Sequence, residues 1–162
     1  MSVTVRPYDP ATDEGWASGF LDDHLGGRRQ ARRGEIIDVL AAGLGLVAGD
    51  GIGLLTYRPD GDTLELSAVA AAPRGAGTGT ALVDALVAVA HEWHVARIWV
   101  ITTNDNVDAL AFYQRRGFRL AEIRSGAVDD ARRSLKPGIP LVGQHGIEMH
   151  DEIELVLELS DS

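Results

Sequence analysis

Apolar positions along the chain follow two periods, one typical of helices and one typical of strands. A stripe of apolar residues three to four positions apart predicts a helix of about four turns. It comprises Leu82, Val83, Leu86, Val87, Ala90 and Trp93. Similar spacing predicts helices over 13–25 and 107–116, the second closed by Gly117. A further short helix is expected over 32–41.

Short apolar or alternating runs bounded by turn residues predict strands. They cover 3–6, 44–48, 52–57, 63–71, 97–102, 118–123 and 152–159. The glycines around Asp50 and the turn residues 58–62 predict two hairpins. The order is hairpins first, then strand–helix–strand, then a final strand pair. It predicts a mixed α/β sheet with helices on its faces.

The connection over 125–151 is the one unusual feature of this order. Connections of that length in compact domains are typically functional or mobile. Its central stretch, 134–147, is rich in proline and glycine but also apolar, so we expect it to pack against protein. No internal repeat or linker is visible in the 162 residues, which predicts a single domain over 1–162.

Charge and composition narrow the classes of partner. A formal net charge of −9 argues against nucleic acid, because phosphate contacts require the opposite sign. The first residues lack a signal-peptide pattern and no apolar run is long enough to span a bilayer, so we expect a cytoplasmic protein without a membrane partner. A local exception is the basic stretch 27–33, interpreted as a solvated helix face or loop, with an acceptor or phosphate contact as the alternative.

Three glycines at every second position, Gly75, Gly77 and Gly79, follow the strand 63–71 and open the central helix. The start of a helix has unpaired N–H groups and the positive end of the macrodipole, so it attracts phosphate. Glycines there allow an oxygen atom to reach the backbone without meeting a Cβ. The pattern predicts a pyrophosphate site, with a glycine-rich turn that binds nothing as the alternative.

Neighbouring residues support the phosphate hypothesis, and the spacing of the glycines excludes two known phosphate-binding motifs. Arg74 adds a positive charge, and Thr78 and Thr80 add hydroxyl groups. The dinucleotide-binding fingerprint G-x-G-x-x-G is not matched, because its third glycine would fall on Thr80 or on Leu82. The P-loop motif is not matched either, because it requires a lysine after its last glycine and the only lysine of the chain is Lys136.

A second group of residues lies on the helix predicted over 107–116. Asn106 stands where this helix begins and can cap it. Ala109, Phe112 and Tyr113 share one face, and on that pattern alone Tyr113 is a core residue with its hydroxyl at the surface.

Together the two segments resemble the GNAT superfamily of N-acetyltransferases. The family's acetyl-CoA signature, R/Q-x-x-G-x-G/A, is matched by residues 74–79. Its second signature, N-x-x-A-x-x-x-Y-x-x-x-G-F, is matched by Asn106, Ala109, Tyr113, Gly117 and Phe118 at every spacing. The resemblance covers about 47–123 well, and the coarse order of elements over the whole chain.

The resemblance implies a single α/β domain with a mixed, mostly antiparallel sheet, splayed central strands at 63–71 and 97–102, and helices on both faces. It implies that backbone N–H groups of 75–80 hold the pyrophosphate of coenzyme A and that the pantetheine arm pairs with 69–71. The residues it assigns to acetyl-CoA, the co-substrate, are Val69, Ala70, Ala71, Arg74, Gly75, Ala76, Gly77, Thr78, Gly79, Thr80, Asn106, Ala109 and Phe112.

The expected reaction is direct attack of a primary amine on the thioester, since the chain has no cysteine to carry the acetyl group. The resemblance places Tyr113 as the proton donor to the leaving thiolate. It suggests Glu65 as a base that works through water, sharing a strand face with Ser67; a solvent-facing strand residue is the alternative. No metal is expected. His91 and His94 are interpreted as a surface helix end, and the polar residues His145, His150, Asp151 and Glu152 as solvated.

Two matters stay open on the sequence. A small-molecule acceptor is favoured over a protein N-terminus or lysine, and a non-catalytic module that binds acyl-CoA is the alternative function. The sequence does not fix the oligomeric state, for which a homodimer is one option, nor the acyl chain preference.

Overall fold

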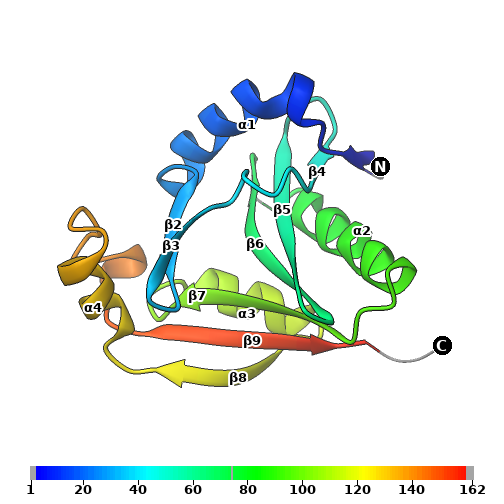
Figure 1. The fold of residues 1–162 in the computed structure, drawn as a ribbon. Helices are drawn as coiled ribbons and strands as arrows, with labels where there is room; N and C mark the ends of the chain where they lie inside the picture. The colour runs from blue at the N-terminus through cyan, green and yellow to red at the C-terminus, as the bar shows by residue number, and fades with distance from the viewer. Residues whose placement is uncertain (1–2, 74, 160–162) are drawn as a thin grey trace. The chain divides into compact units, whose positions relative to one another are not determined.

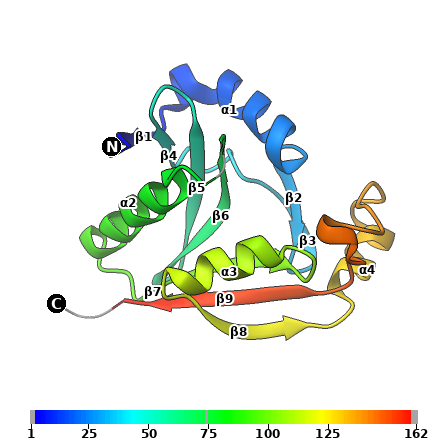
Figure 2. The ribbon, with the colours of Figure 1, turned by 180° about the vertical axis from the view of Figure 1, so that it is seen from behind.

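The computed structural model describes residues 3–73 and 75–159 (Figures 1 and 2). These residues form two compact units. The first contains 3–29, 38–73, 75–98 and 159, and the second contains 30–37 and 99–158. Within the described residues, no helix has the length and apolar character needed to cross a membrane. The predicted class, a mixed α/β fold with mostly antiparallel strands, is confirmed.

The first unit contains four strands, each antiparallel to the next, and two helices. In sheet order the strands are β1 (Val5–Pro7), β4 (Gly45–Ala48), β5 (Gly53–Asp60) and β6 (Thr63–Ala71). The helices are α1 (Pro10–Leu25) and α2 (Thr78–Glu92). Helix α2 contacts all four strands (Figure 1). The strand predicted over 63–71 is therefore confirmed with the same bounds.

Helix α2 buries most of its predicted apolar stripe. Leu82, Val83, Leu86 and Ala90 are buried, as the helical spacing predicts. Trp93 is 42% exposed, so its assignment to the stripe is wrong. The helix ends at Glu92, and the indole instead makes an edge-to-face contact with the ring of Tyr57 in β5.

Helix α1 begins before the predicted start because the residues ahead of it form an N-cap. The Asp9 side chain accepts a hydrogen bond from the N–H of Ala11, and Pro10 occupies the first turn. The carboxylate of Asp13, in that turn, accepts hydrogen bonds from both terminal nitrogens of Arg6, at 2.8 and 2.9 Å. It also accepts one from the N–H of Asp9, at 2.8 Å. These hydrogen bonds, first from Arg6 and then from Asp9, lower the pKa of Asp13 to about 2.

We expect Asp13→Asn to lower the free energy of unfolding at pH 7 by about 1–3 kcal/mol, because hydrogen bonds to a charged group are lost. The pKa of this carboxyl group is lower in the folded protein than in the unfolded chain, so the carboxylate stabilises the folded protein above about pH 4. That stabilisation is lost as the pH falls toward 2. Urea unfolding at both pH values measures the difference. Equal stability of the two proteins at pH 7 would show that the Arg6 contact contributes nothing.

The helix predicted over 32–41 is wrong. Residues 32–38 belong to a hairpin of β2 (Arg29–Arg32) and β3 (Glu35–Asp38), and 39–41 form a turn. Arg33 and Gly34 between the strands both have positive φ, 52° and 77°, as a two-residue hairpin turn requires. The basic stretch is accordingly not a helix face. Arg32 is buried, and the Arg33 guanidinium lies 4.5 Å from the centre of the Trp99 ring.

Besides most of the β2–β3 hairpin, the second unit contains three strands in the order β7–β9–β8, with β9 and β8 antiparallel (Figure 2). They are β7 (Arg97–Thr103), which belongs to this unit from Trp99 on, β9 (Glu152–Glu158) and β8 (Arg119–Arg124). Helix α3 (Val107–Arg115) contacts β8. The long connection contains a helix that the sequence analysis did not predict, α4 (Ala127–Ser134), and a short 3-10 turn, η1 (Gln144–Gly146).

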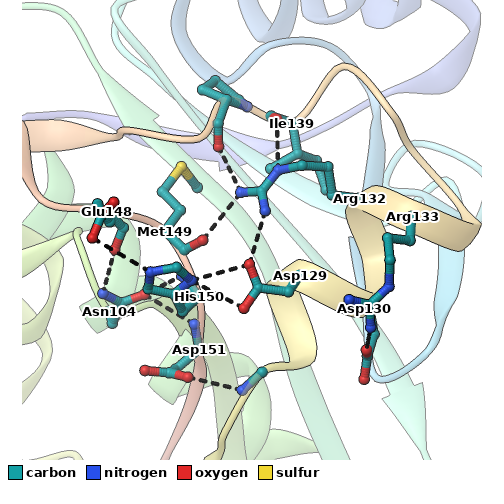
Figure 3. Close-up of polar contacts among 12 residues, drawn as sticks. Asn104, Asp129, Asp130, Arg132, Arg133, Ile139, Glu148, Met149, His150 and Asp151 are labelled. Carbon is teal, nitrogen blue, oxygen red and sulfur yellow. Dashed lines mark hydrogen bonds and ion pairs between the residues drawn. The ribbon is translucent and has the colours of Figure 1, made fainter.

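Hydrogen bonds hold this connection to Asn104 and also join its own parts to one another (Figure 3). Asn104, after β7, accepts the N–H groups of His150 and Asp151 at 2.9 and 3.0 Å through its Oδ1. Arg132 of α4 donates to the carbonyls of Ile139, Pro140 and Met149. These contacts agree with the expectation that the connection packs against protein.

Gly143 fixes the path of this connection. Asp105 is buried, and its Oδ2 accepts the N–H of Gln144 at 2.9 Å. A Cβ on Gly143 would overlap that carboxylate, so only glycine fits. We expect Gly143→Ala to lower the free energy of unfolding by about 1–3 kcal/mol.

The matched control is Gly138→Ala, in the same connection. A Cβ at Gly138 meets no atom within 4 Å, so we expect a change within about 1 kcal/mol, in the stabilising direction. Urea unfolding of both variants measures the contrast. Equal effects would mean that the Asp105 contact does not hold the connection.

Candidate active site

The start of helix α2 is an open backbone surface. Its N-cap is Gly77, with φ 81°, which has no side chain to cap the helix. Gly75 also has positive φ, 80°, and Gly75, Ala76 and Gly77 are all exposed. The first helical hydrogen bond runs from the N–H of Ala81 to the carbonyl of Gly77, so the N–H groups before it lie outside the helical pattern.

The exposed turn leaves room for a ligand beside its backbone. A Cβ built on Gly75 or Gly77 meets no atom within 4 Å, so the space over the backbone is open to a ligand. The first turn of α2 contains no acidic residue that would oppose an anion. Gly79 and Thr80, which follow, are half-buried. Arg74, the predicted charge beside this turn, lies outside the described residues.

Thr78 and Gly53 set the position of the helix start. Thr78 is buried, and its hydroxyl has no hydrogen-bond partner within 3–73 and 75–159. A Cβ on Gly53 of β5 would lie 2.7 Å from the Thr78 Cγ2 atom, so glycine allows the close approach of α2 to the sheet. The sequence analysis missed Gly53, whose importance depends on a contact between distant segments.

The end of β6 contains the residues predicted to pair with the pantetheine arm. Val69, Ala70 and Ala71 are half-buried. In the antiparallel ladder they face Leu55, Leu54 and Gly53 of β5. The register between the two strands shifts at Thr56 and Tyr57, which leaves Ser67 of β6 in a bulge. The Ser67 hydroxyl lies 2.8 Å from the hydroxyl of Thr56.

Glu65 of β6 is almost fully buried, at 1% exposure. The alternative interpretation, a solvent-facing strand residue, is therefore wrong. Its Oε1 accepts the Nε–H of Arg58, opposite it on β5, at 2.7 Å. The ion pair holds the carboxylate in one position, and the sequence analysis did not identify this contact with Arg58.

Tyr113 of α3 is buried, with its ring centre 5.3 Å from that of Phe112 and 5.4 Å from that of Phe118. Its hydroxyl has no hydrogen-bond partner in the described part of the chain. Burial raises the pKa of the Tyr113 phenol. The side chain therefore stays protonated at neutral pH and has a hydrogen bond available to donate.

The other residues of the second signature shape the same helix. Asn106 caps α3, because its side chain accepts the N–H of Ala109 at 3.2 Å. Ala109 and Phe112 are half-buried, and the Arg116 guanidinium lies 4.9 Å from the centre of the Phe112 ring. The first unit thus contains the glycine turn, the end of β6 and Glu65. The second brings together Asn106, Ala109, Phe112 and Tyr113.

Comparison with known proteins identifies the family. A family model described as the acetyltransferase (GNAT) family matches residues 12–118, which include both the glycine turn and Tyr113. The chain belongs to this family.

Among individual relatives, the chain is 45% identical to the uncharacterized protein YdhI of Bacillus subtilis over 106 residues, 65% of this chain and 66% of YdhI. It is 42% identical to YxbD of the same organism over 108 residues, 67% of each chain. The chain thus matches about two thirds of the length of these relatives.

Solved structures share the fold. The IAA acetyltransferase from Bacillus cereus aligns with a TM-score of 0.73 and 22% identity over 98% of this chain and 100% of that one. A GNAT family acetyltransferase from Elizabethkingia anophelis, with acetyl-CoA bound, aligns with a TM-score of 0.71 and 22% identity over 97% of this chain and 98% of that one. A Bacillus subtilis acetyltransferase in complex with CoA aligns with a TM-score of 0.69 and 19% identity over 98% of this chain and 100% of that one.

Proposed function

We propose that this protein is an acetyl-CoA-dependent N-acetyltransferase that acts on a primary amine, with a small molecule favoured over a protein. The observation that carries the proposal is the uncapped start of α2 behind two glycines with positive φ. Membership of the GNAT family and the fold shared with acetyl-CoA-bound and CoA-bound acetyltransferases support it.

The cofactor site is built from backbone. The N–H groups of 75–80 receive the diphosphate, because they lie at the positive end of the helix and outside its hydrogen-bond pattern. Arg74 adds a positive charge. The backbone at Val69 to Ala71 pairs with the pantetheine arm as an added strand. Asn106 orders the start of α3, and Ala109 and Phe112 contribute its cofactor-facing surface.

Acetyl-CoA supplies the thioester, and transfer forms an N–C bond as the C–S bond breaks. The amine must reach the site unprotonated, although a simple alkylamine has a pKa near that of lysine, about 10.4. Glu65 accepts the amine proton through water, held in place by Arg58. Tyr113 gives its hydroxyl proton to the leaving sulfur, and water then returns a proton to Tyr113 and takes the one held by Glu65.

The test is titration of the protein with acetyl-CoA by calorimetry, followed by an assay of thiol release with a panel of primary amines. We expect saturable cofactor binding and turnover with at least one amine. No binding at millimolar acetyl-CoA would contradict the proposal. Tight binding with no turnover across a broad panel would favour the non-catalytic alternative.

A further inference from the structure

Strand β8 is the last strand in the order β7–β9–β8, and its outer edge is open (Figures 1 and 2). Among the described residues it pairs with β9 alone. Residues 119–123 are all exposed, so both faces of the strand reach the surface. An edge strand of this kind presents a row of N–H and C=O groups to a further strand. The backbone of β8 can therefore extend the sheet by one more strand.

A bulge places the two large apolar side chains of β8 on one face. The register with β9 shifts just after Leu120, so Ala121 is the extra residue. Leu120 lies opposite Leu155, and Ile123 lies opposite Ile153. Because these two residues of β9 are two positions apart, they share a face, and Leu120 and Ile123 share it with them. Both side chains of β8 are more than half exposed, at 54% and 65%, so the open edge is apolar on this face.

The opposite face of β8 carries charges in an order that favours a second copy of this chain. Arg119, Glu122 and Arg124 lie on it, opposite alternate residues of β9. Arg119 has no ion pair among the residues that the structure describes. Glu122 is 57% exposed and pairs with Arg124 of its own strand at 3.2 Å. Reversal of one strand against another sets such an arginine against such a glutamate, and opposite charges facing each other across strands are stabilising.

We propose that two copies of this protein form a dimer by antiparallel pairing of their β8 strands. The two-fold axis passes between Leu120 and Ala121, and the two Leu120 side chains meet beside it. Arg119 of each copy then lies opposite Glu122 of the other, and the sheet continues from one copy into the next. The assembly does not depend on the proposed function, because none of 119–124 belongs to the candidate active site.

The charges select this register over one that pairs the apolar residues directly. With Leu120 opposite Ile123 of the second copy, Arg119 would face Arg124, and the two Glu122 side chains would lie together beside the axis. Like charges directly opposite each other on neighbouring strands are destabilising. The proposed register instead forms two pairs of Arg119 with Glu122, one on each side of the axis.

Sedimentation velocity over a range of protein concentrations tests for the dimer. We expect the unmodified protein to sediment with twice the mass of one chain. Leu120→Lys should raise the dimer dissociation constant at least about tenfold, because it sets two like charges beside the axis. Leu141→Lys is the matched control, since Leu141 is 69% exposed in the same unit, and it should leave the constant unchanged.

Charge reversal tests the register. Arg119→Glu alone sets two carboxylates opposite each other and should weaken the dimer, and Glu122→Lys alone should do the same with two cations. The double variant Arg119→Glu/Glu122→Lys restores opposite charges and should recover most of the affinity. Both residues are exposed, so these variants should fold, which circular dichroism checks. A double variant that dimerises as weakly as the single variants would contradict this register.

Cross-linking gives a readout that does not depend on charge. The chain has no cysteine, so Leu120→Cys introduces one thiol in each copy, and a short bis-maleimide should join two copies through these thiols. Leu141→Cys should stay unjoined. Unmodified protein that is monomeric at every concentration would overturn the proposal. So would a dimer that Leu120→Lys and the single charge reversals leave unchanged, or a dimeric Leu120→Cys protein that does not cross-link.

Discussion

Gly77→Ala weakens acetyl-CoA binding by about tenfold or more, a loss of about 1.4 kcal/mol in binding free energy. Gly77 has φ 81°, and a Cβ there would stand in the open space over the helix start. The methyl group would meet no protein atom within 4 Å. It would therefore oppose the diphosphate directly, and the strained φ would displace the N–H groups that hold it.

Gly126→Ala is the matched control. Gly126 is the N-cap of α4, has φ 75°, and a Cβ there also meets no atom within 4 Å. The two variants should lose a similar free energy of unfolding, about 1–2 kcal/mol, from the same backbone strain. Only Gly77→Ala should weaken acetyl-CoA binding in a calorimetric titration. Unchanged affinity in that variant would mean that the diphosphate binds elsewhere.

Tyr113→Phe lowers kcat by roughly 100-fold, the order expected when one proton donor is removed. The Tyr113 hydroxyl has no hydrogen-bond partner within the described ranges, so its loss breaks no hydrogen bond to those residues. The KM for acetyl-CoA should change much less, because the ring still packs between Phe112 and Phe118. Steady-state thiol release measures both constants.

Tyr57→Phe controls for the substitution itself. Tyr57 is also buried, but it contacts Trp93 in the first unit and lies outside the proposed site. It should leave kcat within about twofold of the unmodified enzyme. Because burial raises the pKa of Tyr113, its phenol should stay protonated up to about pH 10. Ionisation of Tyr113 should therefore not lower kcat at any pH below that value. Equal kcat for the Tyr113→Phe variant and the unmodified enzyme would remove Tyr113 from the mechanism.

Elements with a clear apolar pattern were predictable from the sequence. The strand 63–71 is an apolar run between turn residues, and β6 has those bounds. Helix α2 was predictable from a stripe that the sheet then buries. The glycine turn was predictable because closely spaced glycines are costly to order and are typical of positions with positive φ, as Gly75 and Gly77 have here.

Elements that depend on distant contacts were not predictable. Helix α4 is mostly polar, and its Arg132 and the residues around it are held by hydrogen bonds to other parts of the connection. The hairpin β2–β3 depends on positive φ at Arg33, which non-glycine residues seldom adopt. The burial of Glu65 depends on the strand register that places Arg58 opposite it.

The most direct test follows the backbone N–H signals of 75–80 by nuclear magnetic resonance while coenzyme A is added. Diphosphate bound at the start of α2 should shift the signals of Gly75, Gly77 and Gly79 strongly. Those of Gly126 and Gly138, in the 125–151 connection, should move little. Saturation of the protein with coenzyme A while the three glycine signals stay in place would contradict the proposed cofactor site.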